Sequence, residues 1–286
     1  MSAAAWARLL AVGWVACAVP ARLAAQYGVC RPGSGSNEAK TLAILSVPVV
    51  FSPGAPAGGP SGITFALEAA RVPGVDPATA TPTICRPGKG PENTGVLPAI
   101  ARPRIEVPLP HGLALEASWI PPVRVNGVKA NLFGFALMES VGHRDGLAAT
   151  VRAHATFGSV HAPVTCDRDA LSDPVSECFG GTVSDDRYSP NIMGVDLSLG
   201  WSMAGGRLRP YVGSGYNRLE PRFQVNFTNQ FGNTDRTSVA VTLDRVALFG
   251  GAAWQLTERL AITGEIYAAA ADAATGRLVI RRTFGS

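Results

Sequence analysis

Large apolar side chains alternate with small or polar ones through residues 192–203, which read IMGVDLSLGWSM. The apolar set occupies every second position from Met193 to Met203, and Asp196 lies in the middle of the other set. A strand sends successive side chains to opposite faces, so the stretch predicts a strand with one apolar and one polar face. Its length suits a tilted strand that crosses a bilayer, which takes roughly 9 to 11 residues.

The same alternation recurs along most of the chain and predicts about ten strands, with eight to twelve allowed. Between two short alternating segments stands Asn126-Gly127, a strong signal for a hairpin. The segments with the pattern are 61–70, 102–107, 113–119, 132–139, 147–157, 192–203, 207–216, 237–255, 260–267 and 278–284.

Connections of two lengths alternate between these segments. Short ones lie near 108–112, 142–146, 204–206 and 257–259, and longer or more variable ones lie at 72–98, 160–190 and 218–236. If the strands run antiparallel, the two sets fall at opposite ends of the sheet. Outer-membrane barrels have short periplasmic turns and longer external loops. The pattern therefore predicts an all-β fold, an antiparallel up-and-down transmembrane β-barrel, over residues 61–286.

The polar faces of these strands carry charged side chains near their centres. Lone buried charges are costly in the core of a soluble sandwich, whereas in a small barrel they pair across the interior or are hydrated. We therefore expect a lumen in which acids pair with Arg and His. The side chains expected to face it are Glu68, Glu116, Arg152, His154, Asp196, Asp244, Glu265 and Arg281.

Composition agrees with a membrane barrel. Only 16% of residues are charged, yet no apolar run approaches the roughly 18 residues of a membrane helix. Residues 1–25 resemble a secretory signal peptide, with an apolar core at 9–19 and a cleavage site before Gln26 or after Ala21. Its removal takes away Arg8 and Arg22, so the formal charge falls from +4 to about +2. Such a balance argues against a nucleic-acid partner.

Four cysteines remain in the exported chain: Cys30, Cys85, Cys166 and Cys178. An even number in an exported protein predicts disulfides, and three pairings are possible. The local pairing is Cys166 with Cys178, which leaves Cys30 for Cys85. A metal site is not expected, because these cysteines have neither CxxC spacing nor a nearby His.

Residues 26–60 precede the predicted barrel. The part at 41–51 is apolar and rich in β-branched residues, but Pro48 interrupts it. We expect either an N-terminal extension or an irregular first strand. An extra strand would break the even count that brings both ends of the barrel to the periplasmic side.

Together, the alternation, the loop asymmetry, the signal peptide and the terminal strand resemble small outer-membrane β-barrel proteins of Gram-negative bacteria, of the OmpA-like or OmpW-like type. The resemblance covers residues 61–286 and includes no family-specific motif. It implies location in the bacterial outer membrane, contact with outer-membrane lipid, insertion by the barrel-assembly machinery, and a monomer. Such barrels usually end on an aromatic residue, whereas here Gly285 and Ser286 follow Phe284.

For function, the sequence predicts a structural role, or passage or binding of small solutes, without enzyme activity, cofactor or metal. The pattern allows both a narrow pore and a closed barrel. One alternative is a soluble periplasmic β-sandwich or lipocalin-like binding protein. A second is an outer-membrane lipid-modifying enzyme, which would need His154 and a serine to face the bilayer, whereas the alternation points His154 inward. An adhesin, the third, would place its function in the loops at 160–190 and 218–236.

Overall fold

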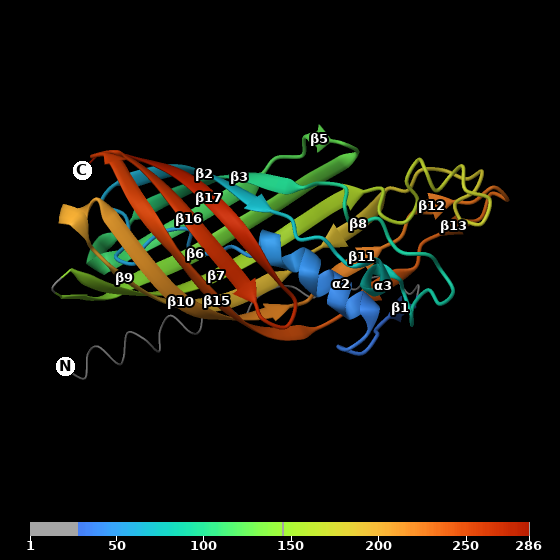
Figure 1. Ribbon diagram of the computed structural model, residues 1–286, viewed down its shortest axis with the longest axis horizontal. Coiled ribbons are helices and arrows are strands. Elements are labelled where there is room, and N and C mark those ends of the chain that lie inside the picture. Colours follow the sequence, from blue (N-terminus) through green and yellow to red (C-terminus); the bar gives the residue numbers. More distant parts are fainter. Residues whose placement is uncertain (1–27, 145, 286) are drawn as a thin grey trace.

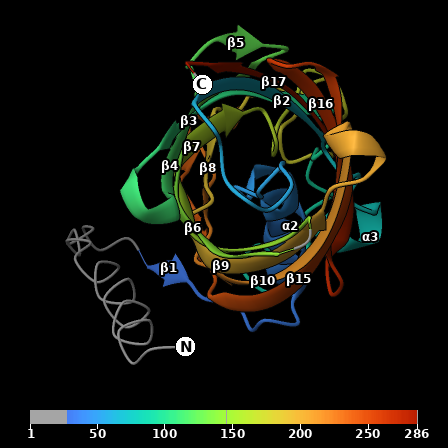
Figure 2. The same ribbon diagram turned by 90° about the vertical axis from the view of Figure 1, so that its left-hand side faces the viewer.

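A computed structural model describes residues 28–144 and 146–285, so the expected signal peptide at 1–25 lies outside the described residues. Ten strands pair antiparallel with their neighbours, and pairing of the last with the first closes a barrel (Figures 1 and 2). The predicted fold class is confirmed. The barrel strands are β2 (Ile63–Arg71), β3 (Ala99–Pro108), β4 (Leu113–Ile120), β6 (Val128–Arg144), β7 (Leu147–Ala162), β9 (Ile192–Trp201), β10 (Leu208–Leu219), β15 (Leu243–Thr257), β16 (Leu260–Ala269) and β17 (Ala273–Phe284).

One end of the barrel, the turn end, carries short connections, including η2 (Pro110–Gly112) and η3 (Ala204–Gly206). The other end, the loop end, carries the long ones. Here β5 (Arg124–Val125) forms a hairpin with β6 through Asn126 and Gly127, whose φ angles are 49° and 83°. Positive φ at both central residues is what a tight type I′ hairpin needs, so the Asn-Gly signal predicted this turn correctly.

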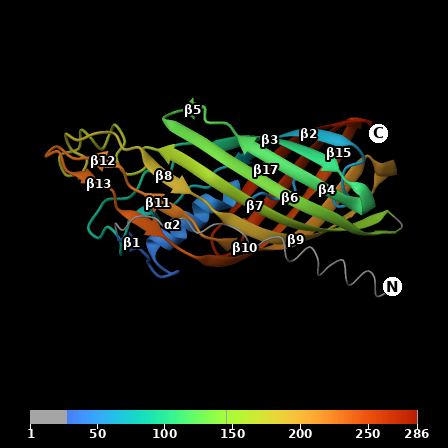
Figure 3. The same cartoon turned by 180° about the vertical axis from the view of Figure 1, so that it is seen from behind.

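Beyond the loop end the chain forms a head, which comprises the loops at 72–98, 162–191 and 219–242 together with residues 28–36 (Figures 1 and 3). Part of the barrel sheet continues into it, because β8 (Asp186–Ser189) pairs with the end of β7 and also with β11 (Arg222–Gln224). The head elements are β1 (Val29–Cys30), α3 (Pro77–Ala80), β8 (Asp186–Ser189), β11 (Arg222–Gln224), β12 (Phe227–Thr228), β13 (Thr234–Asp235) and β14 (Ser238–Ala240).

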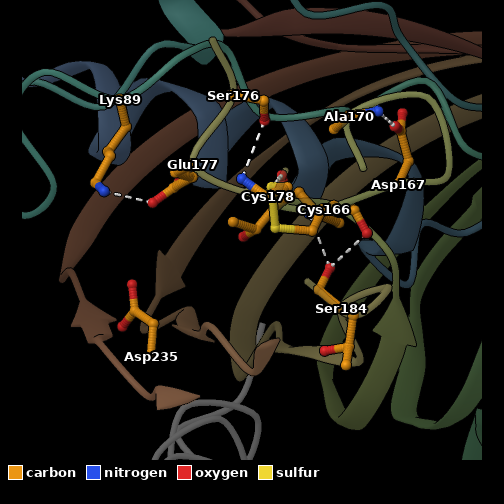
Figure 4. Close-up of a disulfide and its surroundings, with 12 residues drawn as sticks. Lys89, Cys166, Asp167, Ala170, Ser176, Glu177, Cys178, Ser184 and Asp235 are labelled. Atoms are coloured by element: carbon orange, nitrogen blue, oxygen red, sulfur yellow. Dashed lines mark hydrogen bonds and ion pairs between the residues drawn. A yellow bond between two sulfur atoms is a disulfide. The ribbon is translucent and has the colours of Figure 1, made fainter. Parts of the chain in front are cut away.

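Two disulfides cross-link this head. Cys30 is bonded to Cys85, and Cys166 to Cys178, as the local-pairing argument predicts. The first ties the start of the described chain to the 72–98 loop. The second closes a short loop, which Figure 4 shows with Ser184 hydrogen-bonded to it.

Residues 37–60, which we name the plug, lie inside the barrel. They begin with α2 (Asn37–Ser46) and η1 (Val47–Val49) and continue without regular structure to the turn end. Looking along the barrel from that end, Figure 2 shows α2 within the ring of strands. The Ser36 side chain caps α2 by accepting a hydrogen bond from the Ala39 backbone N–H at 3.2 Å.

The plug is therefore not the irregular first strand that the sequence allowed. On α2, Ala39, Leu42, Ala43 and Ser46 are buried, the i, i+3, i+4, i+7 spacing of one helix face. Pro48 falls in the first turn of η1, where its missing N–H leaves no hydrogen bond unmade. Within the part of the chain that the structure describes, α2 and the other helices are too short or too polar to cross a membrane.

Candidate functional site: the plugged lumen

The outward face of the barrel is apolar from strand to strand. On β9, Val195 and Leu197 are 52% and 49% exposed, while the intervening Asp196 is 1% exposed. Aromatic side chains flank this apolar surface at both ends. Trp201 and Trp254 lie towards the turn end, and Trp119 stacks on Phe133 towards the loop end. Such aromatic girdles are typical of strands that cross a bilayer.

The inward face carries charged side chains that are almost wholly buried. Of the residues expected in the lumen, six are at most 5% exposed, and the side chain of Arg281 is 12% exposed. The six are Glu68, Glu116, Arg152, His154, Asp196 and Glu265. Burial of so many ionisable groups requires that each finds partners inside the barrel.

Strand register brings acids and arginines together across the wall. Arg152 is directly opposite Asp196 in the β7–β9 pair, and its guanidinium lies 3.1 Å from that carboxylate. The same guanidinium lies 2.8 Å from Glu116 on β4. Glu116 also pairs with Arg104, which in turn pairs with Glu68. A continuous chain of ion pairs therefore runs around one side of the lumen.

Four lumen arginines were missing from the sequence prediction: Arg102, Arg104 and Arg277, each at most 4% exposed, and the half-buried Arg209. The signal was present, because Arg102, Arg104 and Glu106 alternate along β3 as the polar face of a strand. Pro103 and the short length of the predicted strand hid this periodicity. These arginines matter because they hold the plug.

Guanidinium groups from the barrel wall donate hydrogen bonds to plug backbone carbonyls. Most of these carbonyls lie beyond η1, on a segment without regular structure, so the arginines satisfy groups that would otherwise be buried without partners. The bonds are Arg277 to Val47 (2.9 Å) and Val50 (2.9 Å), Arg102 to Val49 (3.3 Å) and Val50 (3.2 Å), Arg152 to Phe51, Arg104 to Ser52 and Pro53 (2.9 Å each), Arg281 to Gly54 (3.2 Å), and Arg209 to Ala57 (3.1 Å).

Phe51 is the central side chain of the plug and is fully buried. The guanidinium carbons of Arg102, Arg104 and Arg152 lie 5.1, 4.6 and 4.7 Å from its ring centroid. Cations over an aromatic face are attracted by the ring quadrupole, more strongly when desolvated. Phe51 thus separates arginines that would otherwise repel one another at close range.

Backbone shape also fits the plug to the wall. Gly54 has a φ of +57°, and a Cβ there would meet Nη1 of Arg104 at 2.8 Å. Its backbone N–H donates to Glu265 at 3.0 Å, and the Ser52 hydroxyl donates to the same carboxylate at 2.5 Å. Glu265 is thereby the acidic anchor of the plug, opposite in role to the arginines.

An apolar exterior around a charged interior is the reverse of a soluble barrel, and a polar interior with an apolar outer band is typical of membrane barrels. The chain has the fold of a bacterial outer-membrane β-barrel. This excludes the β-sandwich architecture. It also differs from a lipocalin-like binder, whose apolar residues would face inward.

Comparison with known proteins finds no matching family model and no matching curated protein. The similar solved structures are outer-membrane barrels. They include the outer membrane protease OmpT from Escherichia coli (10% identity, 79% of this chain and 97% of that chain, TM-score 0.41), the attachment invasion locus protein Ail of Yersinia pestis (7%, 79% and 97%, 0.29) and outer membrane protein Omp33 of Acinetobacter baumannii (8%, 79% and 100%, 0.31). At such low similarity, the assignment rests on this barrel's own geometry, and the OmpA-like or OmpW-like subtype stays a prediction.

Asp244 is a correction to the predicted lumen. Its side chain is exposed on the outer surface and accepts a hydrogen bond from the Tyr216 hydroxyl at 2.6 Å. The apolar residues that alternate with it, such as Val241 and Leu243, point inward instead and join the cluster around α2. Near the loop end α2 fills the barrel, so the side chains that face inward there are apolar. The polar side chains of these strands therefore do not mark the lumen at this end.

His154 is buried beside Asp196, with its Nε2 atom 3.4 Å from the carboxylate. Its β7 position faces the lumen, as predicted, and not the bilayer. Among residues 28–144 and 146–285, no cluster of three or more His, Cys, Asp or Glu side chains is arranged to hold a metal ion.

Glu92 and Glu38 are among the carboxyls in and beside the head whose pKa values are shifted. Burial raises the pKa of Glu92 to about 7, although the charge of Arg86 opposes the shift. For Glu38 on α2, burial acts upward, but backbone N–H groups of Cys85, Ile84 and Thr83 outweigh it and lower the pKa. The ionised Glu38 carboxylate therefore ties α2 to the loop that holds the first disulfide.

Proposed function

We propose that this chain is a monomeric outer-membrane protein whose barrel is closed by its own plug and anchors the head at the cell surface. The observation that carries the proposal is the set of hydrogen bonds from buried arginines to plug carbonyls between Val47 and Ala57. The plug segment that accepts these hydrogen bonds occupies the lumen along most of its length. Free passage of solutes would require this segment to leave.

The expected orientation follows from loop length. External loops of such barrels are longer than periplasmic turns, so the loop end and the head would face outward. Two contacts stabilise the outer loops of the head. They are the Cys166–Cys178 disulfide and the ion pair between Lys89 and Glu177, whose charged atoms lie 2.5 Å apart (Figure 4). A closed barrel then serves as a membrane anchor, and the surface role belongs to the head.

A catalytic role is not part of the proposal. His154 and Asp196 are at most 5% exposed and lie behind the plug, where a lipid substrate has no access from the bilayer face. If His154→Ala abolished a lipase or acyltransferase activity of the purified protein, an enzyme would replace the anchor as the better account.

Planar-bilayer conductance tests the closure. We expect the refolded protein to be silent while it still migrates as a heat-modifiable barrel on gels. A variant that lacks residues 28–60 and carries Cys85→Ser should give stable single-channel steps. The matched control is the full-length Cys30→Ser/Cys85→Ser protein, which keeps the plug and should stay silent. Stable steps from the folded wild-type protein would contradict the proposal, whether or not the deletion variant folds.

A further inference from the structure

A cavity of about 100 Å³ lies where the plug, the barrel wall and the head meet. The plug contributes Leu45 and Val49, β7 contributes Val160 and Ala162, and β11 contributes Phe223. A second cavity of about 50 Å³ shares Leu45, Val164 and Phe223 with it. Both cavities are partly open to their surroundings, and both are lined almost wholly by hydrocarbon.

The ionisable groups at the edge of the larger cavity are already bonded within the protein. One carboxylate oxygen of Asp186 accepts from the backbone N–H groups of Val164 (3.1 Å) and Thr165 (2.6 Å), and the other accepts from Asn226 (2.8 Å). The hydroxyl of Tyr188 is hydrogen-bonded to that of Ser46 at 2.7 Å. Neither group is left to bind a polar ligand.

Water is a poor occupant of such a space. A buried water needs two to four polar partners, and engineered apolar cavities of about 150 Å³ stay dry and bind benzene or xenon. The close packing of protein interiors makes an apolar void a loss of contact energy that an apolar occupant recovers. The size and lining therefore favour a compact hydrocarbon group.

We propose that this cavity binds a small neutral hydrocarbon group, such as a single aromatic ring or a branched alkyl chain. The site goes beyond the anchoring function, because it gives the junction of plug and head a ligand of its own. The occupant would touch the plug at the step from α2 to η1, as well as β7 and β11. Either a free small molecule or the end of a lipid acyl chain supplies this chemistry.

Photolabelling of the full chain in lipid nanodiscs with a trifluoromethyl phenyl diazirine tests the site. Lipid-facing residues such as Leu197 should be labelled and act as the internal control. The decisive position is the plug segment 45–49, which lies inside the barrel and lines the larger cavity. We expect segment 45–49 to be labelled. Excess toluene should prevent the labelling of this segment and leave the labelling of Leu197 unchanged. Label at Leu197 with none at 45–49 would overturn the proposal.

Two variants of equal added bulk sharpen the test. Ala162→Phe fills the cavity and should abolish labelling at 45–49. Ala153→Phe adds the same ring to the outward face of β7 and should leave it unchanged. If Ala162→Phe does not fold, the toluene competition on the wild-type protein still decides.

A lipid with a diazirine at the end of its acyl chain separates the two sources. Toluene-sensitive labelling of 45–49 by this lipid identifies the acyl chain as an occupant. Labelling by the phenyl diazirine alone identifies a free hydrocarbon. Both results support a hydrocarbon site, whereas labelling of 45–49 that toluene cannot compete would count against a defined site.

Discussion

Arg152 makes three kinds of contact, one within the barrel wall and two with the plug. It pairs with Glu116 and Asp196, donates to the Phe51 carbonyl, and lies over the Phe51 ring. A buried ion pair adds little net stability compared with well-packed apolar groups, yet loss of one partner strands the other charge. The arginine is therefore hard to remove, whatever its net contribution.

Arg152→Met should destabilise the protein by about 3–5 kcal/mol, because Glu116 and Asp196 lose their shared cation while they stay buried. Urea unfolding in lipid, followed by the gel shift of the folded barrel, measures the change. Arg282→Met is the matched control, since Arg282 is exposed and should cost within about 1 kcal/mol. Equal effects of the two variants would mean that the lumen charges are solvated.

The raised pKa of Glu92 makes the stability of the head depend on pH. Its pKa is about 7 when folded and 4.5 for the ordinary carboxyl, so the folded state binds the proton more tightly. Stability therefore declines as pH rises from 4.5 to about 7. Hydrogen exchange at the Asn93 amide, corrected for intrinsic pH effects, should speed up over this window, and Glu92→Gln should flatten the profile. The lowered pKa of Glu38 acts oppositely, at more acidic pH. An unchanged slope in the variant would contradict this assignment.

At the scale of elements, a disulfide just before the plug links the chain to the 72–98 loop of the head. The Cys30–Cys85 disulfide spans a sequence separation of 55 residues, and the Glu38 carboxylate accepts from backbone N–H groups of Ile84 and Cys85. Both contacts hold α2 rather than the segment deeper in the lumen. The mouth of the barrel and the interior are thus secured by different chemistry.

Cys30→Ser/Cys85→Ser should loosen α2 while the arginines keep the rest of the plug in place. A disulfide that closes a loop of this length contributes about 2–4 kcal/mol. Trypsin cleavage after Lys40, which is exposed on α2, should therefore become faster. The matched control, Cys166→Ser/Cys178→Ser, removes a disulfide from the head alone and should leave cleavage at Lys40 unchanged. Equal acceleration in both variants would show that the head unfolds as one unit.

At the scale of the whole molecule, the sequence predicted the wall and seven of its eight expected lumen residues, but it did not predict that residues 37–60 lie inside the barrel. Met193 to Trp201 alternates because one face meets an apolar exterior and the other a charged lumen, so a single period is enough to orient it. Beyond η1 the plug has no regular structure and therefore no such period. Asp244 was misplaced because local alternation does not reveal that α2, distant in sequence, fills the barrel mouth.

The path of the plug also determines at which end of the barrel the first described residues lie. The barrel's two ends do meet at the turn end, because Ile63 pairs with Phe284. Residues 28–60, however, run back through the lumen, and Val29 pairs with Ser238 in the head. If the head faces outward, the first described residues lie at the cell surface and the last at the periplasmic side.

An epitope inserted before Gly28 should therefore bind antibody on intact cells. An epitope at Val175, which is 92% exposed in the head, should behave in the same way. An epitope at Gly205 in the turn end should bind only after the outer membrane is permeabilised. Surface labelling at Gly205, with none at Val175, would show that the barrel has the opposite orientation in the membrane. Surface labelling at Val175 but not before Gly28 would instead mean that the plug does not pass through the lumen in cells.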